Sequence, residues 1–289
     1  MHGGRVVLVV GLAGEDSGKT LAAAGLVEAL RGQGVDAVGS KPMAGVRLWA
    51  ESWLVGEAER RGVLVSDDGL RLWSASGGTA SVSVEAVNPV VVYHVLPDPE
   101  SVGFYLSRLP SWGTVILGRV SRCSSTGRVE TLHFINTDLL RRLPETVEDA
   151  VLRVAVSLKP YPLKSNYELA RKVLEGGYAG EARSCLERLA GEHEMVIVES
   201  NSDRALPLPG MRKPCMVVAV SPGRILLVDP DRYWRAVELK GAGSTVEEIL
   251  SLAGVLEGLP LPLPSDLERE GVPSVFTGLA SRIAGSCVE

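Results

Sequence analysis

The stretch GLAGEDSGKT, residues 11–20, directly follows the apolar run RVVLVV at residues 5–10. A glycine-containing loop that ends in Gly-Lys-Thr, between a strand and a helix, is typical of a phosphate-binding loop. In such a loop the backbone N–H groups surround the phosphates, a lysine contacts the β- and γ-phosphates, and a Ser or Thr hydroxyl holds Mg²⁺. Lys19 and Thr20 are the residues of this chain that fit those two roles.

The loop departs from the usual pattern at one position. The pattern has a glycine five positions before Gly18, and this chain has Ala13 there. A small residue fits at this point if its φ is negative, so nucleotide binding remains the prediction. The alternative is a glycine-rich turn that binds no ligand. The predicted nucleotide-binding residues are Gly14, Glu15, Asp16, Ser17, Gly18, Lys19 and Thr20.

Two further charged residues stand at the ends of expected strands. Glu199 lies near the end of the buried strand EMVIVES, residues 194–200, and Lys41 follows DAVGS, residues 36–40. The carboxyl ends of parallel strands line the ligand crevice of a doubly wound sheet, so we expect both residues to meet Lys19 there. A carboxylate near a phosphate loop binds Mg²⁺ directly or through water, which makes Glu199 a candidate metal ligand. The alternative for each residue is a solvated charge at a strand end.

The order of the elements that must position these residues indicates an α/β fold. Strands that alternate with helices predict a doubly wound, mostly parallel sheet, here in a single domain over residues 1–289 with an excursion around 100–180. Residues 114–120 and 128–135 form either a hairpin or two sheet strands. The other expected strands are 5–10, 36–40, 194–200, 215–221 and 224–229. The expected helices are 19–31, 47–61, 67–77, 167–177, 181–191 and 229–239, and residues 259–264 are expected to be extended.

The composition narrows the class of protein. With 289 residues, 45% hydrophobic residues and a net charge of −5, the chain is typical of a globular protein and lacks the basic excess of proteins held on nucleic acid by charge. No apolar run is long enough to span a membrane, and the N-terminus resembles a core strand rather than a signal peptide. We therefore expect a cytoplasmic protein. The scarcity of Gln and Asn favours a thermophilic source. The cysteines, expected to be isolated reduced thiols, are Cys123, Cys185, Cys215 and Cys287.

Five segments follow one another in the order found in dethiobiotin synthetases, and the chain resembles that family. The family shows G-T-D-x-x-x-G-K-T, K-P-V-x-x-G, an acidic S-D-A-L-like segment, V-N-P, and V-E-G-A-G-G at a strand end. The chain is still more similar to a set of archaeal P-loop ATPases/GTPases of unassigned role, which keep an NP…PDP segment and a VES strand end. The five segments here are GLAGEDSGKT, SKPMAGVR, SDDGLRL, AVNPVVVYHVLPDPES and VIVESNSD.

The resemblance implies a role for each matching residue. Lys19 and Thr20 would bind phosphates and Mg²⁺, and Lys41 would contact the substrate or the transferred phosphoryl group. Asp68 (or Asp67) and Glu199 would be carboxylates linked to the metal. The segment PDPES replaces the family's S-P-H and puts acids where an anionic substrate would be repelled, which argues against biotin synthesis itself.

The expected function is a Mg²⁺-dependent P-loop ATPase that activates a small-molecule substrate by phosphoryl transfer, as a ligase or a kinase does. The absence of an N-K-x-D motif favours ATP, but it leaves GTP open. One alternative is a nucleotide-dependent switch or assembly ATPase that acts as a homodimer. Another is a nucleotide-binding module without catalysis. No membrane or nucleic-acid partner is expected.

Overall fold

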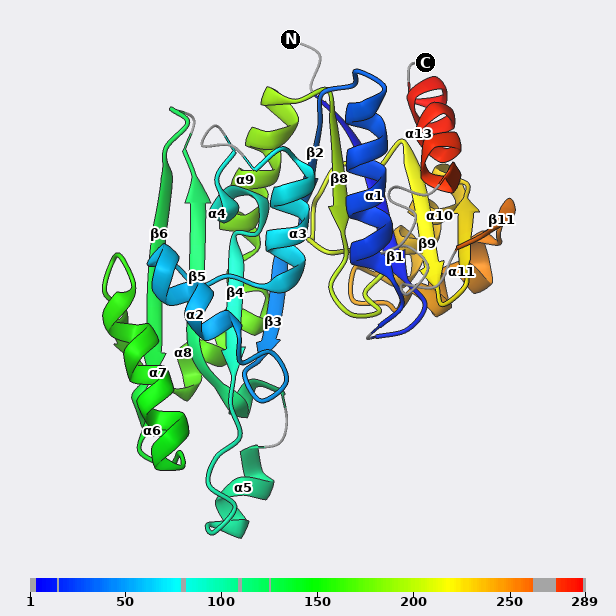
Figure 1. Cartoon of the computed structure of the whole chain (residues 1–289). Coiled ribbons are helices and arrows are strands. Elements are labelled where there is room, and N and C mark those ends of the chain that lie inside the picture. The colour runs from blue at the N-terminus through cyan, green and yellow to red at the C-terminus, as the bar shows by residue number, and fades with distance from the viewer. Residues whose placement is uncertain are drawn as a thin grey trace. The chain divides into compact units, whose positions relative to one another are not determined.

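The structure of the protein is a computed structural model that describes residues 4–14, 16–78, 82–108, 111–124, 126–261 and 274–287. These residues form an α/β protein with two mixed β-sheets (Figure 1). The chain divides into two compact units. Unit 1 comprises Met1–Pro42, Asp68–Val87 and Leu186–Glu289, and unit 2 comprises Met43–Asp67 and Asn88–Cys185. None of the helices in the described ranges has the length and hydrophobicity that a membrane span needs.

Unit 1 contains a six-stranded sheet with the strand order β11–β10–β9–β1–β8–β2. Strands β2, β8, β1 and β9 run parallel to one another, whereas β10 and β11 are antiparallel to their neighbours. Strand β1 is buried from Val6 onward, as its uninterrupted apolar sequence requires for a strand covered on both faces. The strands are β1 (Arg5–Gly11), β2 (Ala37–Ser40), β8 (Met195–Glu199), β9 (Met216–Ser221), β10 (Arg224–Val228) and β11 (Glu257–Pro260).

The helices of unit 1 pack on this sheet and on one another. Helix α1 contacts β1, β2, β8 and β9 and lies beside α13, as Figure 1 shows. Gly25 of α1 faces the ring of Phe276, and a Cβ at this position would overlap the ring, so glycine permits the close approach of α1 and α13. The helices are α1 (Lys19–Gly32), α3 (Asp67–Ala75), α4 (Val84–Val87), α10 (Pro230–Lys240), α11 (Val246–Ala253) and α13 (Ser274–Ser286).

Unit 2 contains a five-stranded sheet with the strand order β3–β4–β5–β6–β7. Strands β4, β5 and β6 are antiparallel, and the edge strands β3 and β7 run parallel to their neighbours. The strands are β3 (Met43–Arg47), β4 (Val90–His94), β5 (Val115–Cys123), β6 (Val129–Asn136) and β7 (Leu163–Ser165). The helices are α2 (Leu54–Arg61), α5 (Val102–Arg108), η1 (Ser111–Thr114), α6 (Thr137–Leu140), α7 (Glu145–Ser157), α8 (Tyr167–Lys172), η2 (Val173–Gly177) and α9 (Ala179–Glu192), which continues into unit 1.

The α/β class is as expected from the sequence, but the organisation differs from the expected single sheet in one domain. A second sheet begins at Met43 rather than near residue 100, and the helix expected over 47–61 is wrong at its start, because β3 ends at Arg47 and α2 begins at Leu54. Strand β3 is short, and its pairing with β4 depends on residues distant in sequence, so local pattern does not reveal it. Strands β5 and β6 pair as a hairpin, one of the two predicted arrangements.

The four cysteines are paired, so the expectation of isolated thiols is wrong. Cys123 and Cys185 form a disulfide in unit 2, and Cys215 and Cys287 form one in unit 1. The partners are 62 and 72 positions apart, and spacing alone does not show which distant cysteines the fold brings together.

The segment expected to be extended over 259–264 is described only in part. Strand β11 ends at Pro260, and residues 262–264 lie outside the described residues.

Candidate functional site

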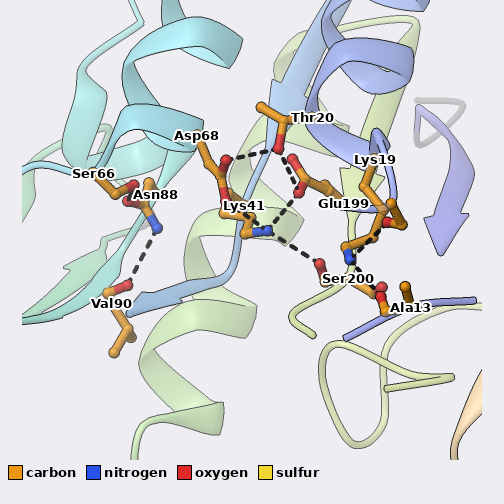
Figure 2. Close-up of polar contacts among 11 residues, drawn as sticks. Ala13, Lys19, Thr20, Lys41, Ser66, Asp68, Asn88, Val90, Glu199 and Ser200 are labelled. Atoms are coloured by element: carbon orange, nitrogen blue, oxygen red, sulfur yellow. Dashed lines mark hydrogen bonds and ion pairs between the residues drawn. The ribbon is translucent and has the colours of Figure 1, made fainter. Parts of the chain in front are cut away.

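The candidate site lies in unit 1, where three parallel strands end side by side. Strand β8 lies between β1 and β2, with Glu199 opposite Val9 and Val198 opposite Ser40. The loop after β1, Lys41 after β2 and Glu199 at the end of β8 therefore share one edge of the sheet (Figure 2). The carboxyl edge of a parallel sheet is where α/β proteins bind ligands.

Helix α3 brings Asp68 to the same edge because it packs directly on β2. Gly39 of β2 makes this possible: a Cβ there would lie 2.9 Å from Cβ of Leu72. The backbone N–H of Gly39 also donates a hydrogen bond of 2.9 Å to Oγ of Ser76. Together these contacts hold the first turn of α3 beside the end of β2, so Asp68 reaches Lys41.

Two carboxyl groups, one ammonium group and one hydroxyl group form a connected cluster (Figure 2). Lys41 Nζ lies 2.5 Å from Glu199 Oε1 and 3.0 Å from Asp68 Oδ2, and it donates a 3.1 Å hydrogen bond to the carbonyl of Ser200. Thr20 Oγ1 lies 2.6 Å from Asp68 Oδ1 and 2.9 Å from Glu199 Oε1. Lys41 and Glu199 are almost completely buried, at 2% and 1% exposed.

The loop between β1 and α1 contains two residues with a left-handed backbone conformation. Asp16 and Gly18 adopt φ values of 51° and 87°, and left-handed residues occur in turns whose N–H groups bind anions. No side chain caps the N-terminus of α1, where the helix dipole favours negative charge. Lys19 Nζ points back over the loop, where it donates to Ser17 Oγ at 3.0 Å and to the carbonyl of Ala13 at 3.3 Å.

The remaining predicted loop residues differ in their surroundings. Gly14 faces the turn after β8, since a Cβ at this glycine would lie 3.2 Å from Oγ of Ser202. Ser17 is buried, whereas Asp16 is exposed. Glu15 lies outside the described residues.

Burial and mutual charge shift the pKa values of both lysines. Burial lowers the pKa of Lys19, and repulsion by Lys41 lowers it further, against the attraction of the nearby carboxylates. Burial also disfavours the charged form of Lys41, but the carboxylates of Glu199 and Asp68 outweigh it and raise the pKa of this ammonium group. Lys41 is therefore held as a cation, while Lys19 is easier to deprotonate than a solvated lysine.

The two carboxyl groups shift in opposite directions. Burial raises the pKa of Glu199 to about 7, with an added contribution from the charge of Asp68 and with opposition from Lys41 and Thr20. Burial also acts to raise the pKa of Asp68, but the Lys41 charge and the hydrogen bonds from Thr20 and Lys41 outweigh it and lower the pKa. Asp68 is thus a carboxylate at neutral pH, and Glu199 binds a proton more readily than a solvated glutamate does.

Two buried polar atoms at the end of β8 have no hydrogen-bond partner among the described residues: Glu199 Oε2 and Ser200 Oγ. Buried polar atoms in proteins are nearly always hydrogen-bonded, to protein, water or a ligand, so both atoms can take a partner from outside the chain.

Of the predicted site residues, Thr20, Lys41, Asp68 and Glu199 contact one another, and Lys19 lies in the adjoining loop with Ser17 and Ala13 as its partners. Sequence reasoning missed the carbonyl of Ser200 and the contacts of Gly39 that hold α3. The VES motif draws attention to Ser200, but no local signal reveals the packing of α3 on β2.

No protein-family model and no curated protein matches this chain. Among the described residues, no group of three or more His, Cys, Asp or Glu side chains is placed to hold a metal ion. The interpretation of the site therefore depends on its own geometry and chemistry.

Proposed function

We propose that the chain is a Mg²⁺-dependent P-loop nucleoside triphosphatase that binds ATP, with GTP as the alternative nucleotide, and transfers the γ-phosphoryl group to a small-molecule acceptor. One observation supports it above the others: Thr20, at the start of a helix that follows a glycine-containing loop, contacts both Asp68 and Glu199 through its hydroxyl group. A hydroxyl and carboxylates in this arrangement are the protein groups that position Mg²⁺ beside a bound triphosphate.

The loop and Lys19 supply the affinity for phosphate in this proposal. The uncapped N-terminus of α1 and the left-handed residues Asp16 and Gly18 offer backbone N–H groups to an anion. Lys19 Nζ now contacts Ser17 and Ala13, which are weak partners for a buried ammonium, so a triphosphate is the stronger partner to which it would turn.

The residues present fit a Mg²⁺ ion. Mg²⁺ takes oxygen ligands, and it is commonly held by one or two carboxylates together with substrate phosphates rather than by a cage of protein ligands. Thr20, Asp68 and Glu199 supply oxygen atoms, and the unpartnered Glu199 Oε2 is available to a cation. When bound, Mg²⁺ neutralises charge on the phosphates and orients them.

Lys41 is the residue most suited to act on the transferred group. It carries a buried positive charge beside Thr20 and the carboxylates, where it would stabilise negative charge that develops as the γ-phosphoryl group leaves ADP. The bond from the γ-phosphorus to its bridging oxygen would break with its electron pair leaving on ADP (or GDP), an acceptor oxygen would form the new bond to phosphorus, and the proton of a hydroxyl acceptor would pass to water.

Nucleotide binding is the first test. We expect ATP or GTP with Mg²⁺ to raise the melting temperature and to bind in titration calorimetry, and we expect Lys19→Ala to weaken binding by about tenfold or more. Lys240→Ala, which removes an exposed lysine from α10 of the same unit, is the matched control and should bind as the wild type does. If neither nucleotide at millimolar concentration shifts the melting temperature of the wild type, the proposal is wrong.

Turnover then separates the alternatives. A thermal-shift screen of metabolites with Mg²⁺ and a nonhydrolysable ATP analogue would identify the acceptor of a ligase or kinase. A switch or assembly ATPase would instead hydrolyse slowly without an acceptor and change its oligomeric state with nucleotide, which light scattering measures. Binding without any phosphate release would identify a noncatalytic module.

A further inference from the structure

The ammonium group of Lys41 has three partners among the described residues of unit 1. An ammonium group offers three N–H donors. In this structure Nζ lies 2.5 Å from Glu199 Oε1, 3.0 Å from Asp68 Oδ2 and 3.1 Å from the carbonyl oxygen of Ser200. Its side chain is 3% exposed, so the charge is neutralised by these groups and not by water.

The groups that hold Lys41 are the same groups that fit a metal ion. Thr20 Oγ1 also contacts both acids, at 2.6 Å from Asp68 Oδ1 and 2.9 Å from Glu199 Oε1. Glu199 has its first carboxyl oxygen on Lys41 and Thr20, while its buried second oxygen has no partner among the described residues. The cluster thus offers oxygen ligands for one cation, and the Lys41 ammonium group already contacts the carboxyl groups of both Asp68 and Glu199.

We propose that the Lys41 ammonium is an internal counter-ion that occupies the cation position of this site, and that a divalent metal ion and Lys41 exclude each other from the Asp68 and Glu199 carboxylates. The proposal rests on the Mg²⁺ site of the proposed function and adds its regulation. Two cations at these carboxylates repel each other, and at the buried Glu199 little water screens that repulsion, although the Asp68 side chain is 36% exposed.

This exclusion gives an order to the events at the site. Free Mg²⁺ binds weakly, since it must displace an ammonium that already has three partners. A nucleotide that brings both Mg²⁺ and negative phosphate oxygens offers the metal additional ligands and offers Lys41 a new partner. Lys41 then moves from the acids to the phosphate or the acceptor only after the metal has entered, so an unloaded site holds its reactive lysine in an ion pair.

The test measures Mn²⁺ binding to the full chain without nucleotide, by the electron paramagnetic resonance signal of free Mn²⁺. Lys41→Met removes the internal cation, and we expect it to raise Mn²⁺ affinity by about tenfold or more over the wild type. Lys19→Met is the matched control, because it removes another buried ammonium of unit 1 that contacts Ser17 and Ala13 rather than the acids. We expect it to raise Mn²⁺ affinity less than Lys41→Met does, because Lys19 acts on the acids through its charge at a distance and does not contact them.

Two results would overturn the inference. An unchanged Mn²⁺ affinity in Lys41→Met would mean that Lys41 does not occupy the metal position. Equal gains in both lysine variants would mean that only the net charge of the site matters, and not occupancy by Lys41.

A second variant guards against misfolding. Lys41→Met leaves two acids without their counter-ion, so its melting temperature should be low without metal and should rise with Mn²⁺, unlike that of the wild type. The double variant Lys41→Met/Glu199→Gln removes one charge of each sign, and it should fold without metal and lose the gain in Mn²⁺ affinity. If it retains the full gain, the metal does not use Glu199 and the inference fails.

The inference and the proposed function fail separately. If Lys41→Met binds Mn²⁺ more tightly than the wild type but the wild type binds neither ATP nor GTP, the internal counter-ion is supported and the proposed nucleotide binding is wrong. If the wild type binds nucleotide with Mg²⁺ but Lys41→Met gains no Mn²⁺ affinity, nucleotide binding is supported and the internal counter-ion is wrong.

Discussion

Units 1 and 2 each bury a long cationic side chain, Lys41 in the first and Arg119 in the second, and the two cations have different kinds of partner. Lys41 contacts two carboxyl groups at strand ends. Arg119, which is completely buried in β5, donates to the backbone carbonyls of Leu64 and Asn88. An arginine that donates to backbone carbonyl groups links chain segments to one another, whereas a lysine that contacts clustered carboxylates occupies a position that an external cation can take.

The surroundings of Arg119 support a structural role. The backbone carbonyl oxygen of Asn88 accepts a hydrogen bond from Arg119. The side chain of Asn88 makes two more: Oδ1 accepts from the Ser66 hydroxyl at 2.8 Å, and Nδ2 donates to the carbonyl oxygen of Val90 at 3.2 Å. The segments at 64–66 and 88–90 are thereby fixed to β5 within unit 2. A buried charge is therefore a weak sign of function by itself, and the chemistry of its partners separates the two cases.

The disulfides offer the largest expected effect on stability, and each closes one unit. Removing a cross-link that spans 62 or 72 positions should lower the free energy of unfolding by about 4 kcal/mol, because the unfolded chain regains entropy. We expect Cys215→Ser/Cys287→Ser to destabilise unit 1 and Cys123→Ser/Cys185→Ser to destabilise unit 2, measured by chemical denaturation with hydrogen exchange to identify the unit. Equal loss of protection in both units from either pair would show that they unfold together.

Arg119→Met should lower the free energy of unfolding by about 3 kcal/mol, since it leaves two buried carbonyl groups without their donor. Added Mn²⁺ should not restore this stability, whereas it should stabilise Lys41→Met. Thermal unfolding with and without the metal measures the contrast. If Mn²⁺ restores the stability of Arg119→Met, the distinction between a structural Arg119 and a replaceable Lys41 is wrong.

His133 gives unit 2 a pH dependence of its own. Burial, with a smaller contribution from the charge of Arg119, lowers the pKa of this histidine to about 4, although its hydrogen bond to the carbonyl of Pro160 acts against the shift. The unfolded chain therefore binds a proton that the folded chain rejects between about pH 6.5 and 4, and stability falls as the pH falls through this window.

The expected loss from this histidine is about 2 kcal/mol between pH 7 and pH 5. His133→Gln should remove that part of the pH dependence, as measured by the difference between its denaturation curves and those of the wild type. His193→Gln is the control, because His193 lies at Asp36 near the surface of unit 1. If His133→Gln keeps the pH dependence of the wild type, another titratable group is its cause.

Gly39→Ala should lower the free energy of unfolding by at least about 1 kcal/mol, because the new Cβ would lie 2.9 Å from Cβ of Leu72, which cannot move unless helix α3 moves with it. The same shift moves α3 and hence Asp68, so we expect weaker binding of Mg²⁺ with nucleotide and unchanged binding of nucleotide without metal. Titration calorimetry measures both. Unchanged binding of Mg²⁺ with nucleotide in Gly39→Ala would show that Asp68 does not follow a displacement of α3.

The sequence predicted the parts of unit 1 that rest on local pattern. The uninterrupted apolar strands β1, β8 and β9 and the helix after Gly18 are visible in the chain, and parallel strand ends place Lys41 and Glu199 at one edge. It did not reveal the second sheet, because β3 and β4 are short strands whose pairing depends on tertiary contacts. The disulfides and the packing of Gly39 on Leu72 join distant residues, which spacing does not encode.

The position of β1 in its sheet has a consequence for how the protein is made. Both of its neighbours, β8 and β9, come from residues at or after Met195. During synthesis the apolar strand β1 emerges from the ribosome before the other strands of unit 1, and more than 180 residues must follow before either partner can pair with it. An unpaired apolar strand is prone to aggregate, so we expect the nascent chain to depend on chaperones until β8 and β9 have emerged.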